Sequence, residues 1–378
     1  MRVMRVLTRP NVGGPTLQAI ALWHAHAQLG IGTLLVVGRC SRGEQGIDLV
    51  AHGLPRVAPL HIDRHSVGFV ELPGLGNGLA ALGKLTASSA LRRAMRAYAP
   101  DVVHTHTSAA GWLGRNAAFQ EGVPRVVHTF HGIVLRDYFG PLLSWGLLRL
   151  EARLARRTDA LVAVSPSCRD ELVDLGVAPR SRFAVVRPAV PLPCFHSREE
   201  ARRLLGLAGD AFAVAIYGRL VPVKRVDHFV TAVGLLPDCI GHVHGGGPLL
   251  GRLSKTVSSR VSFCGSTERA RSLLPAYDAL VLSSRREGCP LVAIEAFAAG
   301  VPVVGYDVPG VRDVLGQWGR GVLVPESDGP PGLARALMAL RADRAAAAAL
   351  VQDARAHLSS FHPDVVAAEL LAIYRGRA

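Results

Sequence analysis

Residues 279–297 read ALVLSSRREGCPLVAIEAF. The apolar run Ala279–Leu282 predicts a buried strand, and a helix is expected to begin around Pro290, since proline suits the first turn of a helix. Glu287 then lies in the loop at the helix start, and Glu295 lies more than one turn inside the helix. The stretch therefore predicts a strand–loop–helix unit of a parallel α/β sheet, with two carboxylates close to its loop.

This loop has the chemistry of an anion site. The backbone from Gly288 to Leu291 would face a bound anion, with the positive end of the helix dipole behind it. Glu295 is suited to accept hydrogen bonds from ribose hydroxyls, and Glu287 can do the same for sugar hydroxyls. A single carboxylate usually belongs to a solvated helix face, but two at this spacing among apolar residues favour a binding site.

The same alternation of short β-branched runs and amphipathic stretches covers nearly the whole chain and predicts parallel sheets covered by helices. A length of 378 residues suits two domains of roughly 150 to 200 residues each. Three prolines within Val185–Pro193 forbid a helix there and indicate the boundary. We expect an N-terminal domain, 1–188, a C-terminal domain, 189–360, and a last helix, 361–378, that could pack back on the first domain.

Both domains are expected to be Rossmann-like, doubly wound parallel sheets that face each other across a cleft, where the carboxyl ends of the strands bind ligands. In the first domain the predicted strands are Val3–Leu7, Thr33–Val37, Val102–Val103, Val126–Thr129 and Leu161–Val164. In the second they are Phe212–Tyr217, Ile240–Val243, Val261–Phe263, Ala279–Leu282, Val301–Val304 and Val322–Val324.

Two cations follow the first strand of the second domain. Phe212–Tyr217 leads into GRLVPVK, which places Arg219 and Lys224 at a carboxyl strand end. A guanidinium and an ammonium there can neutralise a diphosphate and stabilise it as a leaving group. An arbitrary Arg and Lys would more often be solvated surface cations, but their neighbours favour the site.

The first strand of the chain ends in RPNVGGP at residues 9–15, ahead of a helix expected from about Thr16 to Leu29. Gly13 and Gly14 would let an anion approach the backbone at the helix amino terminus. The Gly-Gly pair alone is a weak signal, and a plain tight turn explains it about as well, because neither a G-x-G-x-x-G nor a Walker pattern is present.

The composition is that of a well-packed but basic protein, with 49% hydrophobic and 19% charged residues and a formal charge of +14. A basic surface attracts nucleic acid, anionic lipid or phosphorylated small molecules, and part of the arginine excess can equally be compositional. Nucleic acid is the poorest of these partners, because no recognised module is present and only 6% of residues are aromatic.

No apolar run reaches the roughly 18 residues needed to cross a bilayer, and the chain starts without a signal-peptide pattern. We therefore expect a cytoplasmic protein. The six cysteines are scattered without a C-x-x-C pair or a zinc-ligand spacing, which favours free thiols.

The whole set of motifs resembles the retaining glycosyltransferases of family 4, a GT-B group that includes bacterial polysaccharide and glycolipid enzymes. The resemblance covers nearly the entire chain, and it implies that 1–188 is the acceptor domain and 189–360 the nucleotide-sugar donor domain. In the second half it lies in Glu287 and Glu295, in GRLVPVK upstream and in AAGVPVV downstream. In the first half it lies in Asn11–Gly14, Val102–His106, His128–Gly132 and Val164–Ser165.

This resemblance implies a role for individual residues. Arg219 and Lys224 would hold the donor diphosphate, Glu295 the ribose and Glu287 the transferred sugar. Gly14 would approach the phosphates from the opposite domain, His131 would contact the donor sugar near the reacting carbon, and Gly265 and Ser266 would lie near the nucleobase. The implied catalytic residues are His131, Arg219, Lys224 and Glu287. The implied donor-binding residues are Gly13, Gly14, Arg219, Lys224, Gly265, Ser266, Glu287, Gly288, Cys289, Pro290, Leu291 and Glu295.

The family mechanism implies transfer of a hexosyl group from a nucleotide diphosphate sugar, with UDP as the commonest nucleotide and GDP as the alternative, to a hydroxyl acceptor. A donor phosphate oxygen would take the acceptor proton, so neither a protein nucleophile, a metal ion nor a cofactor is expected. A nucleotide-sugar 2-epimerase or hydrolase on a similar fold is the alternative function. The sequence departs from the family pattern at His244, where an acidic residue is more usual, and at Cys289.

Two further features leave alternatives open. His104, His106, His128 and His131 end two neighbouring strands and could suggest a metal site, although no acidic residue completes a ligand set. The segment Leu142–Arg157 predicts a basic amphipathic helix, which either lies on an anionic membrane near a lipid-linked acceptor or packs on the sheet with its arginines in solvent. Acceptor specificity is expected from the loops 43–78 and 136–146.

Overall fold

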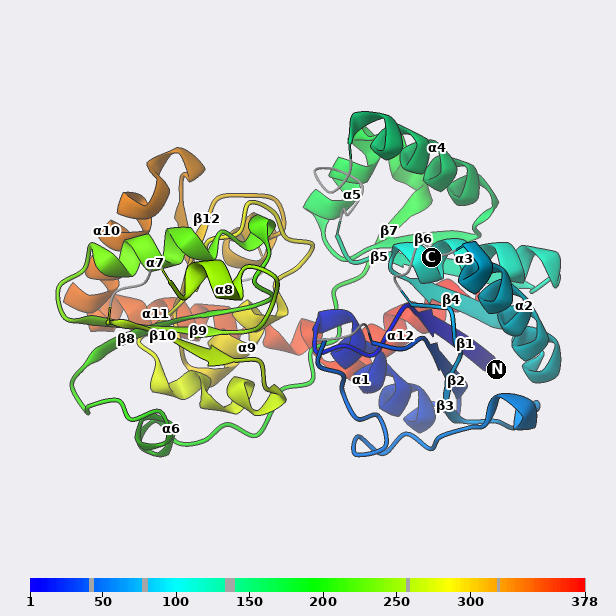
Figure 1. Ribbon diagram of the computed structural model, residues 1–378, viewed down its shortest axis with the longest axis horizontal. Coiled ribbons are helices and arrows are strands. Elements are labelled where there is room, and N and C mark those ends of the chain that lie inside the picture. Colours follow the sequence, from blue (N-terminus) through cyan, green and yellow to red (C-terminus); the bar gives the residue numbers. More distant parts are fainter. Residues whose placement is uncertain (41–43, 77–80, 133–139, 256–258, 318–319, 378) are drawn as a thin grey trace. The chain divides into compact units, whose positions relative to one another are not determined.

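A computed structural model describes the chain except for residues 41–43, 77–80, 133–139, 256–258, 318–319 and 378. The chain forms two compact units. The first comprises Met1–Pro191 together with Phe361–Ala378, and the second comprises Leu192–Ser360. Each unit is a parallel sheet with helices on both faces (Figure 1).

The first unit has seven parallel strands in the order β3-β2-β1-β4-β5-β6-β7. The strands are β1 (Arg2–Leu7), β2 (Gly32–Val37), β3 (Gly68–Glu71), β4 (Val102–His106), β5 (Arg125–Phe130), β6 (Ala160–Ala163) and β7 (Phe183–Val185). The helices are α1 (Gly14–Gln28), α2 (Ala81–Tyr98), α3 (Ser108–Gln120), α4 (Pro141–Arg157), α5 (Pro166–Asp174) and α12 (Pro363–Tyr374).

The second unit has six parallel strands in the order β10-β9-β8-β11-β12-β13. The strands are β8 (Phe212–Tyr217), β9 (Cys239–His244), β10 (Val261–Gly265), β11 (Ala279–Leu282), β12 (Val303–Tyr306) and β13 (Val322–Val324). The helices are α6 (Arg198–Leu204), α7 (Val226–Gly234), α8 (Leu250–Leu253), α9 (Leu291–Ala299), α10 (Gly329–Ala342) and α11 (Arg344–Arg355), with a 3₁₀ segment at Glu268–Ala276.

Both strand orders run outward in opposite directions from a switch point, which lies between β1 and β4 in the first unit and between β8 and β11 in the second. Counted within each unit, both orders begin 3-2-1-4-5-6, as in the Rossmann fold. The prediction of two doubly wound parallel-sheet domains is therefore confirmed. In this fold ligands bind outside the carboxyl ends of the strands at the switch point. We therefore expect the ligand-binding residues on the loops after β1, β4, β8 and β11.

The alternating side chains of β1 explain the two layers of the first unit. Met4 and Val6 belong to an apolar cluster with α2 and α3, whereas Val3 packs on the other face in a cluster with α1 and α12. Figure 1 shows these helix pairs on opposite sides of the sheet. Because Val366 and Leu370 of α12 are part of the second cluster, the C-terminal helix contributes to the core of the first unit.

The structure differs from the sequence prediction mainly at edges. β3 and β7, which are edge strands of four and three residues, were not predicted. β4 extends to His106, beyond the predicted Val102–Val103, because polar residues follow the apolar pair. β12 begins at Val303 and not at Val301, since Pro302 lacks the N–H that a strand needs.

The segment between the two units contains no helix, as the prolines of Val185–Pro193 require. The units separate after Pro191, three residues beyond the predicted end of the first domain. All six cysteines are free thiols. No helix among the described residues is long and apolar enough to span a bilayer.

Candidate active site

The loop after β8 holds both predicted cations. Gly218 follows the strand with φ 155°, a conformation that favours glycine, and Pro222–Lys224 forms a short 3₁₀ turn before α7. Arg219 is exposed on this loop, and Lys224 is partly buried. The positive end of α7 lies directly after Lys224.

A second glycine loop, Gly245–Gly247 after β9, supports the first by direct backbone contact. The Gly218 N–H donates to the His244 carbonyl at 2.9 Å, and the Leu220 N–H donates to the Gly246 carbonyl at 2.9 Å. A Cβ atom at Gly245 would stand 1.8 Å from the Gly218 carbonyl oxygen. Glycine is therefore required at 245 for the two loops to meet.

The β11 loop is tied to the same place. The Ser283 hydroxyl donates to the carbonyls of Lys224 and Arg225, each at 2.9 Å, and the Arg285 N–H donates to the Val223 carbonyl at 2.8 Å. These bonds hold the loop that carries Glu287 against the loop that carries Lys224. They explain why two residues 63 positions apart in the sequence meet.

Lys224 and Glu287 form an ion pair. Lys224 Nζ lies 2.5 Å from Glu287 Oε1, and the Ser284 hydroxyl donates to the same oxygen at 2.6 Å. The side chains retain 25% and 12% of their exposure, so the pair is open enough to be reached by a ligand. Ammonium has three donors, so Lys224 can keep Glu287 while it binds an anion.

Glu295 stands apart from this pair. It lies in the interior of α9, is 3% exposed and accepts a hydrogen bond at 2.6 Å from Arg271 of the 3₁₀ segment. Arg271 was not predicted as a site residue, because a 3₁₀ segment has no clear periodic pattern and the pair spans 24 positions.

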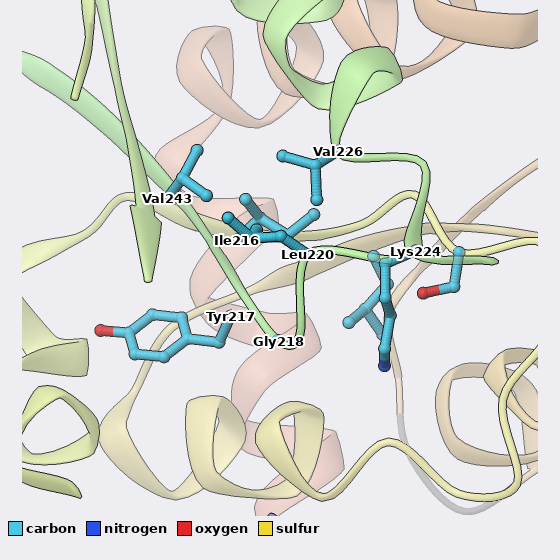
Figure 2. A pocket seen from close by; sticks show the side chains of 9 residues that line it. Ile216, Tyr217, Gly218, Leu220, Lys224, Val226 and Val243 are labelled. Atoms are coloured by element: carbon cyan, nitrogen blue, oxygen red, sulfur yellow. The ribbon is translucent and has the colours of Figure 1, made fainter. Parts of the chain in front are cut away.

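A small hollow lies at the carboxyl ends of β8 and β11. Lys224 and Ser284 line it at one end, together with Gly218, and Tyr217 lines it from the end of β8 (Figure 2). Burial raises the pKa of the Tyr217 phenol well above its usual value, and the Glu295 carboxylate adds to this shift. The Tyr217 ring points away from Lys224 in Figure 2.

The other predicted residues of this unit surround the same loops. Gly288 is buried, and a Cβ atom at Gly310, which has φ 78°, would stand 2.2 Å from the Glu287 carbonyl oxygen and 2.9 Å from that of Gly288. Pro290 is the N-cap of α9 and Leu291 its first residue, and Cys289 is partly buried.

The end of β10 carries the other two predicted residues. The Gly265 carbonyl accepts from the Gly245 N–H at 2.7 Å, and Ser266 is exposed beside it.

His244 carries no charge at neutral pH. It is 4% exposed, and burial, with a contribution from His242, lowers its pKa to about 3. Its ring stacks on Tyr217 with centroids 4.4 Å apart. The departure from the family pattern at this position therefore places a neutral aromatic ring, not a cation, under the glycine loop.

Gly13 and Gly14 lie at the carboxyl end of β1 in the first unit. Gly13 is the N-cap residue of α1, and α1 begins at Gly14 with Pro15 in its first turn. Gly13 has φ 174°, which any residue can adopt, and a Cβ atom there would come no closer than 3.7 Å to any neighbour. Packing within this unit therefore does not require glycine at 13.

His131 follows β5 and is partly exposed. Its Nε2 lies 3.0 Å from Nδ1 of His106 at the end of β4, and burial together with Arg5 lowers its pKa to about 4. His104 bonds Thr129, Tyr374 and the buried Arg5, and His128 bonds Thr105. The histidines at these strand ends are thus uncharged, and each makes at least one hydrogen bond.

These strand-end histidines and the buried His26 of α1 predict that the stability of the protein depends on pH. Burial lowers the pKa of five histidines, to about 3 for His26, to about 4 for His131, and well below the usual value for His104, His106 and His128. An unfolded chain takes up protons at histidine below about pH 6.5, whereas the folded chain does not. The free energy of unfolding should therefore be highest above that pH and fall by about 1.4 kcal/mol per pH unit for each such histidine as the pH drops toward 4.

Urea denaturation at pH 7, 6 and 5 measures this slope. A His26→Asn variant should show a slope smaller by about 1.4 kcal/mol per pH unit. Equal free energies of unfolding at pH 7 and pH 5 in the unmodified protein would contradict the assignment.

The four histidines that the sequence singled out do not form a metal-ligand group. Among the described residues a single cluster has that geometry, and it consists of His242, His244 and Cys264 in the second unit.

Two family models match the chain, one after the other. The model described as Glycosyltransferase Family 4 matches residues 39–192, and the model described as Glycosyl transferases group 1 matches residues 197–357. A D-inositol 3-phosphate glycosyltransferase of Jonesia denitrificans is 32% identical over 72% of this chain and 71% of its own length. A UDP-Gal:alpha-D-GlcNAc-diphosphoundecaprenol alpha-1,3-galactosyltransferase of Escherichia coli is 27% identical over 70% of this chain and 72% of its own.

Solved structures show the same fold. Sucrose-phosphate synthase from Thermosynechococcus elongatus superposes with a TM-score of 0.82 at 21% identity, covering 100% of this chain and 98% of that one. Anabaena Alr3699/HepE, in complex with UDP and glucose, superposes with a TM-score of 0.80 at 19% identity over the whole of both chains.

The chain has two Rossmann-like domains that match these two family models, and in the second domain the loops after β8 and β11 meet around an ion pair. These features define an enzyme of the GT-B glycosyltransferase class. The chain belongs to the glycosyltransferase group 1 family, with an N-terminal domain of the family 4 type. The resemblance inferred from the sequence motifs is thereby confirmed, and the reaction is glycosyl transfer. The epimerase alternative has no support from these relatives, which are named as transferases and synthases.

Proposed function

We propose that the second unit binds a UDP-sugar with its diphosphate at Lys224 and Arg219 and its ribose at Glu295. The observation that carries this proposal is the Lys224–Glu287 ion pair, held where the loops after β8 and β11 meet, with the buried Glu295 in the helix that follows. The choice of UDP rests on the Escherichia coli relative, which is named for UDP-Gal, and on the UDP complex of the Anabaena protein.

The remaining second-unit residues fit around this donor. Glu287 would accept hydrogen bonds from hydroxyls of the transferred sugar while it keeps Lys224 in place. The segment from Gly288 to Leu291 would face the donor phosphates from the start of α9. Gly265 and Ser266 would lie near the nucleobase.

The proposal also gives roles to three residues of the first unit. Gly13 and Gly14 would allow a phosphate to approach the backbone at the start of α1, which gives glycine at 13 a purpose that packing does not. His131, neutral at the pH of the cell, would hydrogen-bond the donor sugar near the reacting carbon without repelling the cationic character that develops there.

The chemistry that we propose is transfer with retention. The bond from the anomeric carbon to the β-phosphate oxygen breaks, and the acceptor oxygen forms its bond to the same face of that carbon. A phosphate oxygen of the departing diphosphate takes the acceptor proton. Arg219 and Lys224 neutralise the leaving group, so the proposed step involves neither a metal ion nor a cofactor.

A thermal-shift screen of nucleotides and nucleotide sugars tests the donor. UDP or a UDP-sugar at 100 times its dissociation constant should stabilise the protein by roughly 2.7 kcal/mol. Uridine, which lacks the diphosphate, should stabilise it much less. A response to GDP or GDP-sugars alone would replace uridine by guanosine, and no response to any nucleoside diphosphate would contradict the proposed function.

We further propose that α4 lies on the anionic, cytoplasmic face of a membrane and brings the enzyme to a lipid-linked hydroxyl acceptor. Leu142, Leu143 and Trp145 at its start are 83%, 55% and 57% exposed. The Arg149 guanidinium lies 5.2 Å from the centroid of the Trp145 ring, which is a cation–π contact. It places a positive charge beside an exposed aromatic side chain. Only Glu151, Leu154 and Ala155 of the helix are buried, so most of it is available for contact.

Liposome co-sedimentation measures this contact. Arg149, Arg153 and Arg156 are exposed, and each arginine near an anionic surface contributes about 1 kcal/mol. Replacing all three by glutamate should lower binding to anionic vesicles at least about 100-fold. A control with glutamate at the exposed Arg203, Arg252 and Arg344 keeps the same net charge, and equal binding by the two variants would contradict the role of α4.

A further inference from the structure

Strands β9 and β10 bring three metal-binding side chains together. His242 and His244 are two residues apart on β9 and therefore share a face of the sheet. Cys264 lies on the neighbouring β10, where the pairing shifts between Phe263 and Gly265. One ligand atom from each of the three side chains lies within 4.8 Å of the other two.

The register shift explains why the cysteine joins the histidines. Phe263 pairs with Val243 and Gly265 pairs with His244, so Cys264 is the extra residue of a bulge. A bulge re-aims the side chain that it carries, and bulges are frequent near functional sites.

Both histidines are hydrogen-bonded to Tyr277, but one of their ring nitrogens has no partner. The Tyr277 hydroxyl lies 3.0 Å from His242 Nδ1 and 2.5 Å from His244 Nε2. His244 is 4% exposed, and within the described part of the chain its Nδ1 has no hydrogen-bond partner. A buried polar atom without a partner is costly, so its retention calls for an explanation.

We propose that His242, His244 and Cys264 bind a zinc ion, with a water molecule as the fourth ligand. Imidazole nitrogens and a thiolate are the ligands that Zn²⁺ prefers, in tetrahedral geometry with bonds of about 2.0–2.3 Å. Such bonds place the ligand atoms roughly 3.3–3.8 Å apart, so the three ligand atoms, which lie within 4.8 Å of one another, would move closer together when the ion binds. The Cys264 thiol releases its proton to solvent as the sulfur–zinc bond forms.

This site goes beyond the proposed sugar transfer and takes no part in its chemistry. A zinc ion there would join β9 to β10 next to Gly265, whose carbonyl already accepts from Gly245. It would therefore fix the Gly245–Gly247 loop, which in turn supports the loop after β8. The role is structural, in contrast to the Arg219 and Lys224 that neutralise the donor.

Cobalt titration of the untagged full-length protein tests the site, because Co²⁺ reports thiolate ligation by a charge-transfer absorption band and tetrahedral geometry by visible bands. The protein should take up one Co²⁺ with both signals, and Zn²⁺ should displace it. Cys264→Ser should lose the thiolate band, and His244→Gln should weaken Co²⁺ binding at least about tenfold, since the loss of a metal contact of this kind is costly.

The matched control is Cys194→Ser, which removes an exposed thiol of the same unit and should leave the spectrum unchanged. Circular dichroism of each variant without metal shows whether the fold persists. Absence of the thiolate band in the unmodified protein would overturn the proposal. A band that persists in a folded Cys264→Ser protein would do the same.

Discussion

Replacing Lys224 by alanine should weaken UDP binding about 10- to 100-fold, because a charge-assisted hydrogen bond contributes about 1.5–3 kcal/mol and tenfold corresponds to about 1.4 kcal/mol. The loss should lie at the upper end of that range. Without the ammonium, the Glu287 carboxylate, whose side chain is 12% exposed, remains near the diphosphate and repels it. Isothermal titration calorimetry with UDP measures the change.

Two controls separate this effect from a general loss of charge or fold. Arg203→Ala removes an exposed cation of the same unit and should leave UDP affinity unchanged. In a Glu287→Gln background the Lys224→Ala effect should shrink, because the repelling carboxylate is gone. A twofold or smaller change in the single Lys224 variant would exclude this residue from the diphosphate site.

Replacing Glu295 by alanine should have two large effects. It removes the carboxylate partner of Arg271, and breaking a buried ion pair typically lowers the free energy of unfolding by about 3–5 kcal/mol. The side chains are 4% and 13% exposed, so solvent screens the pair little. The variant should also lose its thermal response to UDP, because the proposed ribose acceptor is gone.

Comparison of UDP with 2′-deoxy-UDP isolates the ribose contact. Glu295→Gln keeps a hydrogen-bonding side chain of the same size and should be the more stable variant. The unmodified protein should bind UDP at least about tenfold more tightly than 2′-deoxy-UDP, the equivalent of about 1.4 kcal/mol, and Glu295→Gln should lose most of that preference. Glu199→Gln, at an exposed position, is the matched control. A full preference for UDP in Glu295→Gln would displace the ribose assignment.

Much of the fold follows from the sequence because buried parallel strands are apolar runs. β8, β11 and β13 have the predicted bounds, and α4 begins within one residue of its predicted start. Because the prediction relied on apolar runs, it made strands with polar ends too short, as in β4, where it missed His104–His106. Edge strands β3 and β7 are short, and their pairing depends on neighbours that a local pattern does not contain.

The site was predictable where function and local pattern coincide. Arg219 and Lys224 follow a clear strand, and Glu287 precedes a clear helix, so the loops could be placed at one sheet edge. Their roles in donor binding stay predictions. Arg271 and Tyr217 were missed because their involvement depends on tertiary contacts, with Glu295 and with His244.

The segments expected to select the acceptor are described only in part, since residues 43, 77–78 and 136–139 lie outside the described chain. Within the first segment the structure shows a 3₁₀ turn at Pro59–His61 and the edge strand β3. Both lie on the first unit, consistent with an acceptor domain that varies independently of the donor site.

A crystal structure of the protein with UDP would show directly where the diphosphate and the ribose bind. Diphosphate oxygens should lie within hydrogen-bond distance of Lys224 Nζ and of the Arg219 guanidinium, and the ribose hydroxyls should contact Glu295. Ordered UDP bound away from the loops after β8 and β11, or with its diphosphate in solvent and its ribose far from Glu295, would contradict the proposed donor site.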